Sequence, residues 1–267
     1  MPELHRELPL RSLLLYNLMR EFIEFRHREA AFIVSTERFD IVKAAVKRIR
    51  REIAAYIDAF PEFLRAMAPL EDLPGEPPEA VRRMHRASGI VGVGPMAAVA
   101  GTVAQMAAEA ARTEGCRDTI INNGGDIFLH VREEAFIGLY GGESALSGRV
   151  AFKISPEETP LALCSSSSKM GHSLSLGNCN LATVSAGDAS LADAAATLAG
   201  NLSRDPASAR NAAERIAGLP GVRGVLILID DSVAMAGELP ELVPCDDSRI
   251  RARVLRHPLS HSSREGY

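Results

Sequence analysis

The sequence lacks the features that mark several large classes of protein. Its four cysteines stand far apart and form no Cys-x-x-Cys pair, which argues against a disulfide framework or a zinc knuckle and favours a reducing compartment. No stretch approaches the roughly 20 apolar residues of a membrane span. The apolar cluster at 13–16 is too short for the core of a signal peptide, and no small-residue cleavage site follows it. We therefore expect a cytoplasmic protein with no membrane partner.

An excess of one charge is also missing. The chain has 30 basic and 34 acidic side chains and a formal net charge of −4, whereas a nucleic-acid partner requires a strongly basic face. The basic runs at 43–52 and 249–256 are explained by a solvated helix face or an edge strand. With 267 residues, 46% hydrophobic, the chain suits one large domain or two closely packed halves.

Helical periodicity is clear in several segments. Apolar residues recur at helical spacing over 41–60, and Pro95 is well placed in the first turn of a helix over 94–115. Prolines at 68–79 break the periodicity and predict a surface connector. The other predicted helices are 79–87, 190–203 and 206–217.

Strand-like runs make up much of the remaining chain. They surround a few long helices instead of alternating with them, which predicts an α+β fold and allows two related halves. We expect a hairpin turn at Asp230–Asp231. The predicted strands are 118–123, 126–131, 135–140, 149–154, 161–165, 181–186, 222–230 and 232–239.

Two glycine-rich turns lie between these elements. GVGPMAA at 92–98 has the Gly-x-Gly-x-x-Ala spacing of a dinucleotide fingerprint, but no acid follows for a ribose, so a tight turn into a packed helix explains it. INNGGDIF at 121–128 has two interpretations. It is a plain hairpin turn, or Gly124 and Gly125 let backbone N–H groups meet a ligand beside Asp126.

A serine-rich stretch, CSSSSKMGHS at 164–173, follows a predicted strand. Its hydroxyls and successive N–H groups can form an anion-binding concavity. His172 is flanked by small residues and is the histidine expected to titrate near neutral pH. A polar loop without a binding role is the alternative.

One carboxylate interrupts an alanine-rich helix, SLADAAATLAGN at 190–201. Asp193 and Thr197 stand at positions i and i+4 and project in the same direction. Such hard oxygen ligands suit Mg²⁺, and an unpaired charge in an alanine-lined interior is heavily penalised. The alternative is helix capping, with Ser190 as N-cap and Asp193 three residues on.

Taken in order, GVGPMAAVAG, INNGGDIF, GHSLSLG and ADAAAT resemble the ApbE-like superfamily, whose best-known members are magnesium-dependent FAD:protein FMN transferases. The resemblance covers roughly residues 33–245. It implies a single α+β domain of two similar helix-plus-antiparallel-sheet halves with a ligand cleft between them. Residues 1–32 are then an N-terminal extension and 256–267 a disordered tail.

The resemblance also implies a site. Asp193 and Thr197 match the metal ligands, with a backbone carbonyl near 94–98 completing the set, and the implied cofactors are Mg²⁺ and FAD or a related flavin nucleotide. His172 is the candidate general base. The expected ligand-binding residues are Gly94, Asn123, Gly124, Gly125, Asp126, Ser165, Ser166, Ser167, Gly171 and Ser173.

The sequence departs from the transferases in three places. Ala98 stands where they have a lysine, no Asp-Pro or Thr-Gly segment follows His172, and CSSSSK replaces the Thr-Ser-Ser-Gly stretch of related members. We therefore expect the cleft to be retained and the transfer chemistry to be altered or lost.

Three functions remain open. The leading one is a cytoplasmic transferase that binds a phosphorylated ligand with Mg²⁺. The second, implied by the family branch, is sulfide handling in homocysteine formation, with Cys164 or Cys179 involved. The third is a non-catalytic protein that presents the cleft to a partner enzyme. The small-residue helix 94–115 also suggests a homodimer.

Overall fold

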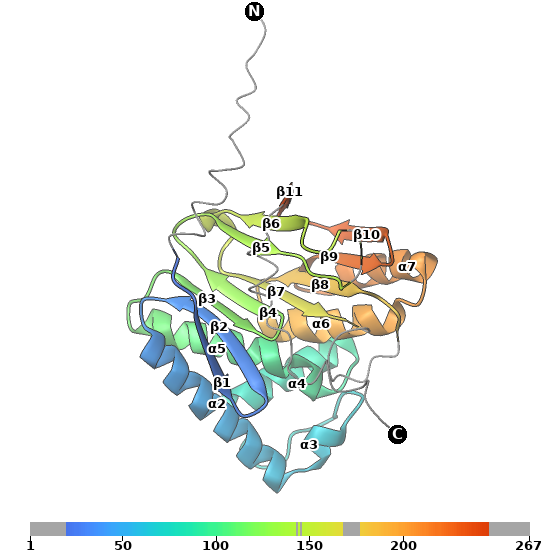
Figure 1. The fold of residues 1–267 in the computed structure, drawn as a ribbon. Coiled ribbons are helices and arrows are strands. Elements are labelled where there is room, and N and C mark those ends of the chain that lie inside the picture. Colours follow the sequence, from blue (N-terminus) through green and yellow to red (C-terminus); the bar gives the residue numbers. More distant parts are fainter. Residues whose placement is uncertain (1–19, 143, 145, 168–176, 246–267) are drawn as a thin grey trace, which may run out of the picture.

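The computed structural model describes residues 20–142, 144, 146–167 and 177–245 of the chain, and the following concerns those residues. An eight-stranded antiparallel sheet forms the centre of the molecule, in the order β1-β2-β3-β4-β7-β8-β9-β10 (Figure 1). Its strands are β1 Ile23–His27, β2 Ala30–Thr36, β3 Thr119–Asn123, β4 Asp126–His130, β7 Leu161–Ser166, β8 Leu181–Ala186, β9 Val222–Ile229 and β10 Ser232–Gly237.

The strand order divides this sheet into two similar halves. Each half is a strand pair, a set of helices and a second strand pair: β1 and β2 lead through helices to β3 and β4, as β7 and β8 do to β9 and β10. In each half the second strand pairs with the third, and the halves join where β4 pairs with β7. This is the predicted α+β architecture of two helix-plus-antiparallel-sheet halves.

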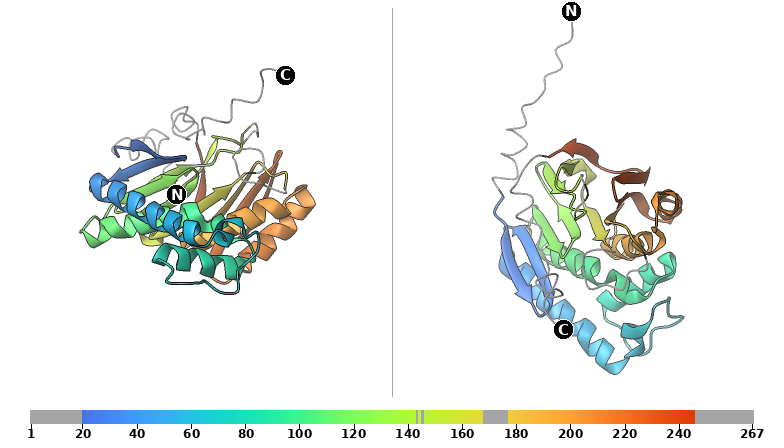
Figure 2. Two further views of the ribbon diagram at one scale, coloured as in Figure 1. Left: turned by 90° about the horizontal axis from the view of Figure 1, so that it is seen from below. Right: turned by 45° about the vertical axis from the view of Figure 1, so that its right-hand side comes forward.

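The helices lie on one face of the central sheet, and a small sheet covers the other face (Figures 1 and 2). The first half contributes α2 Phe39–Ala59, α3 Glu62–Arg65, α4 Glu79–Val91, the 3₁₀ helix η1 Pro95–Ala98 and α5 Val99–Thr113, and the second contributes α6 Ala189–Leu202 and α7 Pro206–Ala217. The small sheet, in the order β11-β6-β5, consists of β5 Ala135–Gly138, β6 Val150–Ile154 and β11 Glu241–Pro244, and the short 3₁₀ helix η2 Pro156–Glu158 follows β6.

Each face of the central sheet has its own apolar core. Successive residues of a strand point to opposite faces, so Ile121 packs under the helices while Ile120 packs under the small sheet. The central strands are therefore apolar on both sides, as sheets covered on both faces are. On the helical side much of the core comes from the alanines of α5 and α6, whereas Leu129 and Phe152 typify the other side.

The predicted helices and strands from residue 41 onward agree closely with the observed ones, including the turn at Asp230–Asp231 between the paired Ile229 and Ser232. The predicted beginning of the core at residue 33 is too late. Strands β1 and β2 belong to the central sheet, and Phe32 is completely buried. The proposed tail at 256–267 lies outside the described residues.

Within the described part of the chain, no single helix is both long and apolar enough to cross a membrane. Only the pair Glu79–Val91 and Pro95–Thr113, bent by 108°, meets the length and composition criteria together. Both helices contribute residues to the core of the helical layer.

Candidate functional site

The two glycines of the NNGGD stretch form the turn between β3 and β4. Gly124 and Gly125 have φ angles of +72° and +117°, a conformation that other residues rarely adopt. Asn123 pairs with Asp126 across the turn, and the N–H of Gly125 donates to Asn122 Oδ1 at 2.8 Å. The hairpin interpretation is therefore correct as geometry. It makes Asp126, which is 8% exposed, the first residue of β4.

Asp193 lies on α6, and its carboxylate contacts the beginning of α5. Its Oδ2 accepts the N–H of Gly101 at 2.8 Å, and the N–H of Ala100 also donates to this carboxylate. Both N–H groups belong to the first turn of α5, where a helix offers no acceptor of its own. The N-cap residue, Ala98, provides no side-chain hydrogen bond. Asp193 therefore caps α5 from the neighbouring helix.

Gly101 lets the two helices approach this closely. A Cβ atom at this position would lie 2.2 Å from the carbonyl oxygen of Ala189 and 2.9 Å from Cβ of Asp193. Such separations are far inside van der Waals contact, so no other residue fits without moving α6. The small residues of the helix 94–115 are evident in the sequence, but no local pattern connects Gly101 with Asp193.

The beginning of α6 corrects one prediction. The N-cap is Asp188, whose Oδ1 accepts the N–H groups of Ser190 at 2.8 Å and Leu191 at 3.2 Å, so Ser190 is not the N-cap. The hydroxyl of Ser190 instead accepts a hydrogen bond from Thr102 Oγ1 on α5 at 2.8 Å. Because capping is supplied by Asp188, Asp193 is left for the contact with α5.

Asp126, Cys164 and Asp193 converge where the two halves of the molecule meet. Burial raises the pKa of Asp126 to about 7, although the N–H of Ser165 donates a hydrogen bond to it and the nearby side chain of Cys164 also favours its charged form. The Cys164 thiol itself donates to the carbonyl oxygen of Ala189 at 3.6 Å. Burial also raises the pKa of Asp193 well above its usual value, and the nearby charge of Asp126 raises it further. Within the described part of the chain, backbone N–H groups and the Cys164 side chain oppose these shifts, and no basic side chain does.

Two buried carboxylates that repel each other are stable when one or both are protonated, or when a bound cation neutralises their charges. Their oxygens are the hard ligands that Mg²⁺ prefers, usually one or two carboxylates with water and phosphate completing the shell. The residues present therefore fit a divalent cation. Among the described residues, no group of three or more His, Cys, Asp or Glu side chains could hold a metal, so phosphate or water would supply the other ligands.

Thr197, the second predicted metal ligand, lies one helical turn beyond Asp193 and is half-buried. Ser165 uses its hydroxyl for a hydrogen bond with Thr183 Oγ1 at 2.8 Å, and only its N–H reaches Asp126 Oδ1, at 3.3 Å. Ser166 lies beside α6, since a Cβ on Gly200 would be 3.4 Å from its hydroxyl oxygen. Of these three residues, Ser165 is the one that contacts an acid of the pair Asp126 and Asp193.

Other predicted site residues lie elsewhere or cannot be placed. A Cβ on Gly94 would be 1.9 Å from the carbonyl oxygen of Ala66, so the structure gives this glycine a packing role against the segment after α3. Gly171, His172 and Ser173 lie outside the described residues. Ser167 is the last described residue before them.

A different polar cluster lies beyond the other end of α5. Cys116 is 3% exposed, and its Sγ lies 3.1 Å from Thr119 Oγ1 and 3.3 Å from Thr36 Oγ1. Burial alone would raise the pKa of this thiol, but the hydrogen bonds outweigh it and lower the pKa. A small pocket opens here, and Cys116 and His130 are among its lining residues.

Comparison with known proteins gives a consistent result. The model of a family described as AbpE bacteria matches residues 17–226. A relative named UPF0280 protein from Methanocella arvoryzae is 39% identical over 227 residues, covering 84% of this chain and 92% of its own length. Another UPF0280 protein, from Archaeoglobus fulgidus, is 40% identical over 232 residues, with coverages of 84% and 94%.

Solved structures share the fold at low sequence identity. The flavinyl transferase ApbE of Pseudomonas stutzeri, in its apo form, aligns with a TM-score of 0.54 and 9% identity, over 81% of this chain and 93% of its own. The flavin transferase ApbE of Vibrio cholerae aligns with a TM-score of 0.53 and 12% identity, with coverages of 81% and 96%. At such identities the likeness concerns the fold alone.

Proposed function

Because the chain belongs to the AbpE bacteria family, we propose that it is a magnesium-dependent protein of the flavin transferase type, which binds FAD or a related flavin nucleotide. The observation that carries this proposal is the buried pair Asp126 and Asp193, for which no basic side chain among the described residues acts as a partner. The names of the structural neighbours supply the ligand class, since both are flavin transferases.

The pair would hold Mg²⁺ between the two halves of the molecule, with Thr197 one turn along α6 as a further oxygen donor. When bound, the metal would neutralise a pyrophosphate and make its phosphorus easier to attack. The chain's own contribution is positional. The N–H groups of Gly101 and Ala100 orient the Asp193 carboxylate, and the N–H of Ser165 orients that of Asp126.

His172 is proposed as the general base that accepts the proton of the attacking group. Its place in the serine-rich stretch, close in sequence to Ser165 on β7, is what supports this role. The residue itself lies outside the described part of the chain.

A non-catalytic binding role is the second candidate, and Ala98 favours it. The transferases that this sequence resembles have a lysine at that place, whereas Ala98 is fully buried and carries no functional group. A protein that keeps Asp126 and Asp193 as the metal-binding pair but lacks the positive charge of this lysine would bind the nucleotide without transferring flavin efficiently.

The sulfide-handling alternative has less support. Cys164 and Cys179 are both completely buried, and burial, together with the charges of Asp126 and Asp193, raises the pKa of Cys164 well above its usual value. A buried, protonated thiol is a poor nucleophile.

The test is a calorimetric titration of FAD with Mg²⁺ or with EDTA. We expect the wild-type protein to bind FAD at least about tenfold more tightly with Mg²⁺, and Asp193→Asn or Asp126→Asn to remove this difference. Asp205→Asn is the matched control, because Asp205 is the N-cap of α7 and asparagine caps equally well. Equal FAD affinity in wild type and Asp193→Asn would contradict the proposal.

If the protein binds FAD as expected, an assay for flavin transfer distinguishes a transferase from a non-catalytic binding protein. Incubation with FAD, Mg²⁺ and a flavin-acceptor protein should yield covalent flavin on the acceptor, visible by mass spectrometry, for a transferase. Tight binding with no covalent product supports the binding role.

A further inference from the structure

The contact between α5 and α6 is made by side chains too small to interlock. At their closest approach, Gly101 of α5, which has no side chain, lies against Ala189 of α6: a Cβ on Gly101 would be 2.2 Å from the Ala189 carbonyl oxygen. Helices normally fix their relative position by fitting ridges of side chains into grooves. Alanine and glycine form shallow ridges, so packing alone defines poorly how far α6 can slide along α5.

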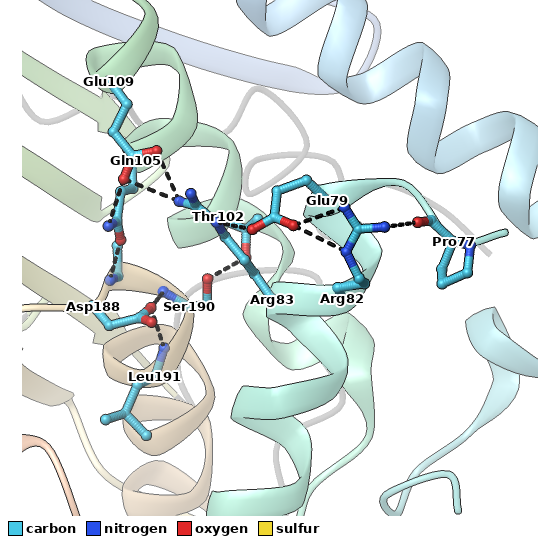
Figure 3. Close-up of polar contacts among 11 residues, drawn as sticks. Pro77, Glu79, Arg82, Arg83, Thr102, Gln105, Glu109, Asp188, Ser190 and Leu191 are labelled. Atoms are coloured by element: carbon cyan, nitrogen blue, oxygen red, sulfur yellow. Dashed lines mark hydrogen bonds and ion pairs between the residues drawn. The ribbon is translucent and has the colours of Figure 1, made fainter. Parts of the chain in front are cut away.

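Three polar contacts define that position instead, and two of them are drawn in Figure 3. The N–H of Ala189, the first residue of α6, donates to Gln105 Oε1 at 2.6 Å, and Thr102 Oγ1 donates to Ser190 Oγ at 2.8 Å. The third is the contact of Gly101 N–H with Asp193 Oδ2. Hydrogen bonds depend on distance and angle, so these contacts favour one register.

Gln105 is itself held by its neighbours (Figure 3). Its Nε2 donates to Glu109 Oε1 at 2.9 Å, and Arg83 Nη1 on α4 donates to both Glu109 oxygens at 3.0 and 2.9 Å. Arg83 Nε donates to Glu79 Oε1 at 2.9 Å. A continuous set of hydrogen bonds therefore runs from α4 through Gln105 to the first residue of α6.

We propose that Gln105, oriented by the Glu109–Arg83 ion pair, is a positioning residue that fixes the register of α6 and thereby places Asp193 beside Asp126. The inference rests on the proposed function only where it treats this acidic pair as the metal site. Without the Gln105 contact α6 keeps its apolar burial but loses one of the contacts that specify its register.

The test compares Gln105→Met and Arg83→Met with Arg82→Met. Arg82 is a matched control, because it is adjacent on α4 and also pairs with Glu79 but makes no contact with Glu109. Amide hydrogen exchange of Gly101 reports whether Asp193 stays in place, and exchange of Ile227 in β9 reports global stability. Binding of Mn²⁺ alone, measured by electron paramagnetic resonance, reports the metal site.

In Gln105→Met, we expect Gly101 exchange to rise about tenfold more than Ile227 exchange, as the loss of one buried hydrogen bond implies. The affinity of Gln105→Met for Mn²⁺ should fall by a similar factor. Arg83→Met should change Gly101 exchange and Mn²⁺ affinity in the same direction but less, and Arg82→Met should change neither.

Equal changes at Gly101 and Ile227 in Gln105→Met would overturn the inference, because the residue would then affect global stability alone. If Gln105→Met does not fold, Glu109→Gln gives the same comparison, since it removes the charge that Arg83 holds while keeping the side-chain volume. Wild-type protein that binds no Mn²⁺ would overturn the metal assignment, while selective loss of Gly101 protection would still establish the register role.

Discussion

The two ends of α5 differ in the surroundings of their carboxylates. Toward its C-terminal end, Glu109 is partly exposed and is paired with Arg83 through two hydrogen bonds. At its N-terminal end, Asp193 and Asp126 are almost fully buried, and backbone N–H groups donate hydrogen bonds to them. A charged carboxylate costs far more free energy when it is buried than when it is half exposed. Glu109, which needs a cation less, is nevertheless the acid that is paired with Arg83.

This difference indicates what the N-terminal end of α5 is for. A fold that needed only to pack α5 against α6 would place apolar or amide side chains at positions 126 and 193, as it does with alanine around them. Two buried carboxylates with no basic partner among the described residues are the arrangement expected of the cation site proposed above. Three measurements test this difference between the two ends of α5: protein stability as a function of pH, the effect of displacing α6, and the reactivity of the thiols of Cys164 and Cys116.

The largest expected effect is on pH dependence. Because the pKa of Asp126 is raised to about 7, the folded protein holds a proton that the unfolded chain releases at lower pH. The free energy of unfolding should therefore fall by a few kcal/mol between about pH 4 and pH 7, and Asp193 contributes in the same direction. Urea unfolding at several pH values measures this.

Asp126→Asn should flatten the profile, while the control Asp205→Asn should leave it unchanged over this range, because the pKa of Asp205 is already lowered by the N–H and hydroxyl of Ser208. Mg²⁺ should stabilise the wild-type protein more at pH 8 than at pH 5. If the free energy of unfolding of the wild-type protein stays constant or rises between pH 4 and pH 7, Asp126 and Asp193 are not a buried pair whose charges repel each other.

The second effect concerns the close approach of the helices. Gly101→Ala should lower the free energy of unfolding by about 2 kcal/mol, because the added Cβ overlaps the Ala189 carbonyl and forces α6 to move. Gly89→Ala is the control. Gly89 lies inside α4 with nothing within 4 Å of an added Cβ, so the substitution should raise stability by about 0.5 kcal/mol through helix propensity. Thermal unfolding of both variants measures the two changes in stability. A Gly101→Ala variant more stable than the wild type would show that α5 and α6 lie farther apart than the structure indicates.

Much of this arrangement could be predicted from local sequence patterns. Apolar spacing predicted α2 and α6, and the Asp-Asp pair predicted the turn between β9 and β10. The order of the motifs predicted that Asp126 and Asp193 belong to one site. That remains a prediction, although the two carboxylates lie near enough for the charge of Asp126 to raise the pKa of Asp193. Each of these inferences uses a signal contained within a few turns of helix or one strand.

What could not be predicted depends on contacts between distant segments. Strand β1 contains the charged residues Glu24 and Arg26, and its place in the sheet depends on Phe25 stacking on Phe32 of β2 and on pairing of β2 with β3. The capping of α5 by Asp193 joins residues 92 positions apart. No periodicity signals such a contact. Asp188 displaced Ser190 as the N-cap because the two stand two residues apart and both are good caps.

The smallest expected effect compares the thiols at the two ends of α5. Cys164, beside the acids, should remain protonated, because burial and the charges of Asp126 and Asp193 raise its pKa. Cys116, beyond the other end, lines a pocket and has hydroxyl partners that lower its pKa. Iodoacetamide should therefore modify Cys116 about tenfold faster than Cys164 in the native protein, since the thiolate is the reactive form.

Peptide mapping by mass spectrometry gives both rates in one sample, and the same measurement in urea should make them equal. Thr119→Val removes one hydroxyl from Cys116 and should slow its modification without changing that of Cys164. If Cys164 reacts as fast as Cys116 in the native protein, its surroundings are neither as enclosed nor as negative as the acidic pair requires. The contrast between the two ends of α5 would then be lost at the end where the metal is proposed to bind.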